Sequence, residues 1–157
     1  MTKSNEIFSI EVEGTRGTCP VGEQRGERNI KEGKIPVFSC EGACIRGEIA
    51  RLAANLTAKE EGFSRACHGE LLTVPHSRIA QWVTNAQQVV LIDGCFLHCH
   101  GRMLKNIIAK EKLIVFDALP MYNKYMDIFD IDDVPEGERK EAARMVAEKV
   151  IINMREL

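Results

Sequence analysis

The chain lacks both an excess of basic residues and a long apolar run, and each absence narrows the classes of function. Twenty-one Lys and Arg residues are balanced by 23 Asp and Glu residues, so the formal net charge is −2 at pH 7. A general nucleic-acid-binding protein would need a basic face, so we expect no nucleic-acid partner. No apolar stretch approaches the roughly 18 residues that cross a bilayer, so we expect no membrane partner either.

The chain also lacks a recognisable signal peptide. Its start, MTKSNEIFS, has one lysine but no apolar segment after it. We therefore expect a cytoplasmic protein, in which disulfides are rare. The six cysteines then indicate metal binding or thiol chemistry. The alternative is that they are small buried apolar residues.

The length of 157 residues favours one domain over residues 1–157. Residues 7–12 (IFSIEV) predict either a first strand or an irregular arm. Residues 14–34 are rich in Gly, Arg, Lys and Glu, and we expect an exposed loop there. A final helix is expected at about residues 134–154, with Asp133 as its cap and Pro135 in its first turn.

Between these segments, short β-favouring runs alternate with helical patterns. Strands are expected at residues 35–39, 63–67, 89–92 and 113–116, and helices at residues 44–61, 77–87 and 95–110. Gly62 is the expected C-terminal cap of the first of these helices, and residues 118–133 are expected to be irregular. The alternation predicts an α/β fold: a mostly parallel sheet of about four to five strands with helices on both faces, in a three-layer, Rossmann-like arrangement.

Five of the cysteines lie where predicted strands end and helices begin. In a parallel sheet these positions share one edge, where ligands bind, and helix N-termini favour the thiolate form of cysteine. We therefore predict a metal site at this edge, with zinc as the ion, because zinc takes four Cys or His ligands. An iron–sulfur cluster is the alternative, since it also needs thiolates. The predicted ligands are Cys40, Cys44, Cys67, Cys95 and Cys99.

Several other polar residues lie at the same predicted edge. They are His68, Asp93, His98, His100, Asp117 and Arg46. Histidines in such positions more often donate hydrogen bonds to ligands than bind the ion themselves. We therefore expect these six residues to support the metal site from outside the ligand set.

The stretch IDGCFLHC resembles the DGC-domain family, which is named for this Asp-Gly-Cys and regarded as zinc-binding. The resemblance covers about residues 35–117 and includes FSCEGAC after a strand, IARLAANL in a helix and the lone cysteine of RACHG. It implies that the five cysteines above are the zinc ligands. One feature departs from the family pattern: the first pair is Cys40-Glu-Gly-Ala-Cys44, where the family typically has Cys-x-Gly-Cys.

Other interpretations of the same residues stay open, including whether the protein is an enzyme. Cys40 and Arg46 have the Cys-x5-Arg spacing of a phosphatase or arsenate-reductase loop, with Asp117 as a general acid. The cysteine pairs could instead serve thiol redox or sulfur handling, or hold a purely structural zinc. The acidic run at residues 127–133 lacks the EF-hand pattern, so we interpret it as a solvated loop and a helix cap.

Overall fold

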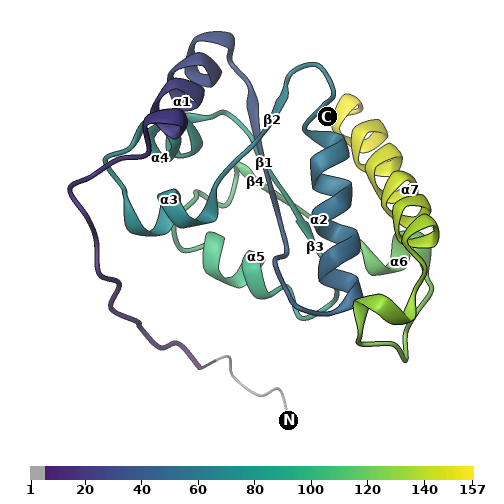
Figure 1. Cartoon of the computed structure of the whole chain (residues 1–157). Helices are drawn as coiled ribbons and strands as arrows, with labels where there is room; N and C mark the ends of the chain where they lie inside the picture. Colours follow the sequence, from purple (N-terminus) through teal and green to yellow (C-terminus); the bar gives the residue numbers. More distant parts are fainter. Residues whose placement is uncertain (1–5) are drawn as a thin grey trace.

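Four short parallel strands form the centre of the protein. The computed structural model describes residues 6–157, and Figure 1 shows the sheet between two layers of helices. The strands are β1 (Ile35–Ser39), β2 (Phe63–Arg65), β3 (Val89–Asp93) and β4 (Leu113–Asp117). Their order is β2-β1-β3-β4, and every neighbouring pair is parallel. The predicted α/β class with a parallel sheet is confirmed.

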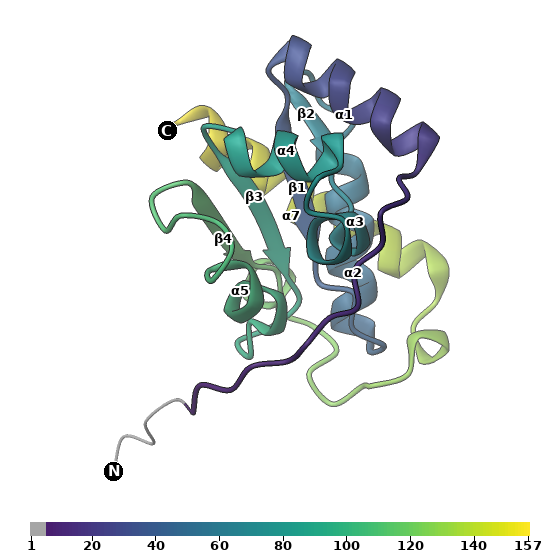
Figure 2. The same ribbon diagram turned by 90° about the vertical axis from the view of Figure 1, so that its left-hand side faces the viewer.

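Seven α-helices and one 3₁₀ helix surround the sheet within the described residues. They are α1 (Pro20–Glu32), α2 (Ile45–Thr57), α3 (His68–Thr73), α4 (Arg78–Asn85), α5 (Cys99–Leu104), α6 (Leu119–Tyr122), η1 (Ile131–Asp133) and α7 (Glu136–Arg155). Helices α2, α6 and α7 cover one face, whereas α3, α4 and α5 cover the other, with α1 packed on α4 (Figures 1 and 2). None of the described helices is long and apolar enough to span a bilayer.

The two central strands are buried on both faces, which explains their uninterrupted apolar sequences. Val37 and Val90 point into the core shared with α2 and α7. Phe38 and Leu91 point into the opposite core, against α3, α4 and α5. Side chains of a strand alternate between faces, so a strand covered on both sides needs apolar residues at every position.

Helix α1 replaces most of the loop that was expected at residues 14–34. It begins after Cys19, whose side chain accepts a hydrogen bond from Gly22 N–H, and ends at Gly33, which has a left-handed φ of 63°. Its buried stripe consists of Gly22, Gly26 and Asn29. Our prediction was wrong here because a helix that buries small and polar residues has no apolar periodicity in its sequence.

Two predicted helix ends also differ from the structure. Helix α2 ends at Thr57, and Gly62, with a φ of 89°, lies in the turn before β2 instead of capping the helix. Helix α7 begins after Pro135, and no side chain caps its first turn. Asp133, the expected cap, belongs to η1 instead. Both differences lie at turns, where tertiary contacts decide which residue leaves the helical conformation.

The helix expected at residues 95–110 is much shorter than predicted. Helix α5 begins at Cys99 and ends at Leu104, and residues 94–97 form a bend and a turn before it. A helix over residues 95–110 would have turned Leu97 and Ile107 inward, but in the structure these residues are 53% and 41% exposed. Residues 7–12 form the irregular arm that was one of the two expected outcomes, and their side chains are exposed.

The close contact between α1 and α4 at Gly26 predicts that this residue tolerates no side chain. A Cβ atom at Gly26 would lie 2.5 Å from the carbonyl carbon of Arg78 and 2.6 Å from the nitrogen of Ile79. Because backbone cannot move aside cheaply, we expect Gly26→Ala to lower the free energy of unfolding in urea by about 1–3 kcal/mol.

The matched control is Gly137→Ala, in the first turn of α7, where a Cβ atom would meet no neighbouring atom. It should leave stability unchanged or raise it by up to about 1 kcal/mol, because alanine favours helix over glycine. Equal stability of both variants would contradict the packing of α1 on α4.

Candidate metal centre

The candidate site lies at the carboxyl ends of β1 and β3. At this point the connections that follow the two strands lead to opposite edges of the sheet. From β1 the chain moves outward to β2 and then returns past β1 to β3 and β4. Cys40 directly follows β1, and its N–H donates to the carbonyl of Ile92 in β3 at 2.9 Å. Asp93 is the last residue of β3. Loops that diverge at such a point leave the crevice in which α/β proteins bind ligands.

Glycines allow the loops after β1 and β3 to pack closely on the first turn of α2. A Cβ atom at Gly47 would overlap the carbonyl oxygen of Gly42 and lie 2.8 Å from its carbon. A Cβ atom at Gly94 would lie 3.0 Å from the carbonyl group of Arg46. These contacts hold the segment that carries Cys40 beside the end of β3.

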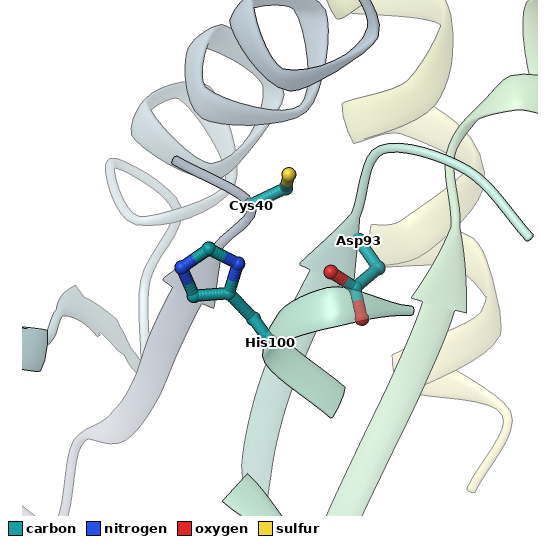
Figure 3. A group of neighbouring side chains, drawn as sticks. All are labelled: Cys40, Asp93 and His100. Atoms are coloured by element: carbon teal, nitrogen blue, oxygen red, sulfur yellow. The ribbon is translucent and has the colours of Figure 1, made fainter. Parts of the chain in front are cut away.

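Three side chains converge at this crevice: Cys40, Asp93 and His100, the last from α5 (Figure 3). One potential ligand atom from each residue lies within 4.8 Å of the other two. Figure 3 shows one carboxylate oxygen of Asp93 and one ring nitrogen of His100 facing each other below the Cys40 sulfur. Thiolate, imidazole and carboxylate are all ligands that zinc accepts.

Two polar atoms of Asp93 and His100 are buried and have no hydrogen-bond partner. Asp93 is 1% exposed, and its Oδ2 accepts a hydrogen bond from Gly101 N–H at 2.9 Å. Its Oδ1 is buried and unpartnered, and so is Nδ1 of His100. Buried polar atoms are nearly always paired, so two such atoms beside a thiol fit a cation between them.

The electrostatic surroundings of Cys40 disfavour its thiolate form when no cation is bound. Burial raises the pKa of its thiol, and the nearby charges of Asp93 and Cys99 add to this effect. The backbone N–H groups of Gly42 and Gly94 oppose it; Gly42 N lies 3.4 Å from the sulfur. A bound cation would favour the thiolate and relieve its repulsion with the carboxylate.

His68 and His98 lie next to the three converging residues. The ring centroid of His68 is 4.8 Å from that of His100 and 4.6 Å from that of Phe38. Burial, followed by the charge of His100, lowers the pKa of His68 to about 4, so its ring is neutral near pH 7. His98 has a left-handed φ of 46°, and its Nε2 lies 3.6 Å from Oδ2 of Asp117.

The other four predicted cysteine ligands are not part of this group. Cys44 precedes α2 and Cys95 follows β3, and both are half-buried. Cys67 precedes α3 and is exposed. Cys99 begins α5 next to His100 and is an exposed residue. The five-cysteine ligand set stays a prediction.

We expected Asp93 and His100 to support the ligands from outside the ligand set. In the structure each of them instead contributes a possible donor atom to the converging group. The sequence carried a signal for each of them. Asp93 ends a buried strand, and a carboxylate there must find a partner. His100 directly follows Cys99, which was itself predicted to lie at this edge of the sheet. Both residues were predicted to lie outside the ligand set because the spacing of the cysteines indicated a site made of thiolates.

Arg46 does not face the thiol of Cys40 as a phosphate loop would require. Its Nη2 donates to the carbonyl of Met126 at 3.0 Å. Ile45 N–H, the first amide of α2, donates to the carbonyl of Phe129 at 2.9 Å. Two donors that an oxyanion would use are therefore occupied by residues 126–129.

Comparison with known protein families gives one result that agrees with this geometry. A family model described as the DGC domain matches residues 36–149. The chain belongs to the DGC-domain family. The matched region extends past β4 into α7, beyond the residues 35–117 that carry the visible resemblance in sequence. Searches of curated proteins and of solved structures find no match to this DGC protein.

The glycine contacts at the centre of the site predict a sharp difference between two alanine variants. Gly47→Ala places a methyl group against the backbone of Gly42, so we expect it to lower the unfolding free energy by about 1–3 kcal/mol. Gly69→Ala is the control, because its Cβ atom would meet only the sulfur of Cys67, at an ordinary 3.8 Å. A Gly47→Ala variant as stable as Gly69→Ala would contradict the loop arrangement.

Proposed function

We propose that this DGC-domain protein binds one zinc ion between β1, β3 and α5. Cys40, Asp93 and His100 are the proposed central ligands. The observation that carries the proposal is the pair of buried, unpartnered atoms, Asp93 Oδ1 and His100 Nδ1, beside the Cys40 thiol. Each would otherwise cost free energy as an unsatisfied polar group, and a single cation satisfies both.

The mixed ligand set favours zinc over an iron–sulfur cluster. Such clusters are held mainly by several cysteine thiolates, whereas the converging group contains a single one. Zinc commonly combines Cys, His and Asp ligands in a tetrahedral site. Three central ligands leave a fourth position. Cys99 is the proposed occupant, because it neighbours His100 at the start of α5 and its charge acts on Cys40.

Metal analysis of protein purified without added metal tests the proposal. We expect one equivalent of zinc per chain and no visible absorbance. Cys40→Ser, Asp93→Asn and His100→Gln should each weaken zinc binding by at least about tenfold in competition with a chromophoric chelator, since even residues outside the ligand set typically contribute that much.

The control is Cys19→Ser, in which serine replaces the cysteine that caps α1, a position that serine suits well. It should bind zinc as the unaltered protein does. The variants Cys44→Ser, Cys67→Ser, Cys95→Ser and Cys99→Ser then decide which of the predicted cysteines complete the site. Iron with acid-labile sulfide, or no metal at all, would refute the proposal.

Zinc should also stabilise the folded chain, because an unfolded chain cannot hold the three residues together. At free zinc one hundred times the dissociation constant, binding should add about 2.7 kcal/mol to the unfolding free energy. Thermal unfolding with zinc and with a chelator measures this difference. The His100→Gln variant should lose the stabilisation by zinc but keep the stability that the unaltered protein has in chelator. An equal stabilisation of the variant and the unaltered protein by zinc would mean that zinc binds elsewhere.

A further inference from the structure

An arm at residues 6–18 exposes apolar side chains that the rest of its own chain leaves uncovered. Ile7, Phe8, Ile10 and Val12 are 95%, 82%, 77% and 55% exposed. Phe8, Ile10 and Val12 are two residues apart, so in an extended strand they share one side. Figure 2 shows the arm leaving α1 and running toward the side where α5 and β4 lie. Apolar groups gathered in this way mark an interaction segment.

Strand β4 offers an open edge to such a segment. Among the described strands it pairs with β3 alone. Val89 N–H donates to the carbonyl of Lys112, and Ala118 N–H donates to the carbonyl of Asp93. Because backbone groups alternate along a strand, the even-numbered residues of β4 face β3. Val115 and Asp117 therefore direct their N–H and C=O groups to the open edge.

Exposed apolar side chains of β4 and of the α5 segment lie on the same face of the sheet. Val115 points to the α5 face of the sheet and is 37% exposed, because the short α5 does not cover it. Met103 and Ile107, in α5 and the turn after it, are 40% and 41% exposed. An added strand would bury its own alternate apolar residues against this surface while its backbone pairs with β4.

The arm and this edge carry opposite charges. Residues 6–13 (EIFSIEVE) contain Glu6, Glu11 and Glu13 and no basic residue, whereas the segment 102–112 contains four basic residues and one acidic residue, Glu111. Arg102, Lys105 and Lys110 are exposed, and none of them forms an ion pair within residues 6–157. The same holds for the three glutamates of the arm. Complementary charges of this kind select a partner and its alignment.

The opposite edge of the sheet is a poorer acceptor. Strand β2 has three residues, too few to pair with the apolar part of the arm. Helix α1 reaches this strand, because Arg25 and Asn29 both donate hydrogen bonds to the Ser64 hydroxyl at 3.1 Å. Short, covered edges resist strand addition, which leaves β4 as the edge available for pairing.

We propose that two copies of this protein exchange their arms. Residues 7–12 of one copy add to β4 of the other as a fifth strand, and the second arm does the same in return. The exchange places Phe8, Ile10 and Val12 over Val115 and its apolar neighbours, and it brings the glutamates of each arm to the basic segment of its partner. A reciprocal contact of this type closes a two-fold symmetric dimer.

The first experiment measures the mass of the full-length protein in solution by light scattering and sedimentation at micromolar concentrations. We expect twice the 17.6 kDa of one chain. Ile10→Glu should raise the dissociation constant of the dimer by about tenfold or more, because a buried isoleucine side chain is lost. Ile152→Glu is the matched control, since Ile152 in α7 is 57% exposed and lies in neither the arm nor the β4 surface. It should stay dimeric.

A charge-exchange series tests the partner surface without assuming an alignment. Replacing Glu6, Glu11 and Glu13 by Lys should weaken the dimer, and so should replacing Arg102, Lys105 and Lys110 by Glu. A chain with all six changes should dimerise again, because its arm and edge are once more opposite in charge. Failure of the six-fold variant to recover, while it remains folded, would exclude the basic segment as the arm's partner.

Hydrogen exchange distinguishes the second copy from other occupants. In the dimer, the amides of residues 7–12 and of Val115 should be protected together, and Ile10→Glu should remove both protections. A monomer with a freely exchanging arm would overturn the proposal. So would a monomer with a protected arm, which would mean that the arm folds onto its own chain.

Discussion

The pairing of β1 with β3 is the contact on which the rest of the molecule depends. These strands are separated along the chain by α2, β2, α3 and α4, yet Cys40 N–H bonds to Ile92 at 2.9 Å. This pairing buries Val37, Phe38, Val90 and Leu91 between the two helical layers. It also brings the residue that ends one strand beside the residue that ends the other, so the same contact that stabilises the fold forms the crevice of the candidate site.

Small residues set how closely the layers approach. Gly42, Gly47 and Gly94 bring the loops of the crevice against α2, and Gly26 brings α1 against α4. Gly101 has a similar role within the site, because its N–H holds Asp93 Oδ2 while a Cβ atom there would lie only 2.9 Å from that oxygen. Close packing of this kind leaves little room for repositioning, which suits a site whose donor atoms must converge.

Helix α5 connects the two regions for which we make proposals. It is six residues long, and it carries His100 toward the crevice while Met103 lies 40% exposed on its surface. Because the helix is short, it leaves Val115 of the edge strand uncovered. The same element therefore supplies a proposed zinc ligand on one side and part of the proposed dimer surface on the other.

The sequence by itself determined the α/β class, the positions of β1, β3 and β4, and the gathering of polar residues at one edge, because apolar runs and strand–helix alternation are local patterns. It did not reveal α1, since a helix that buries Gly22, Gly26 and Asn29 has no apolar stripe. Nor did it show that the group of possible donor atoms would combine the Cys40 thiol with Asp93 and His100. That choice depends on strand order and on where α5 begins, and both are decided by packing between segments far apart in the chain.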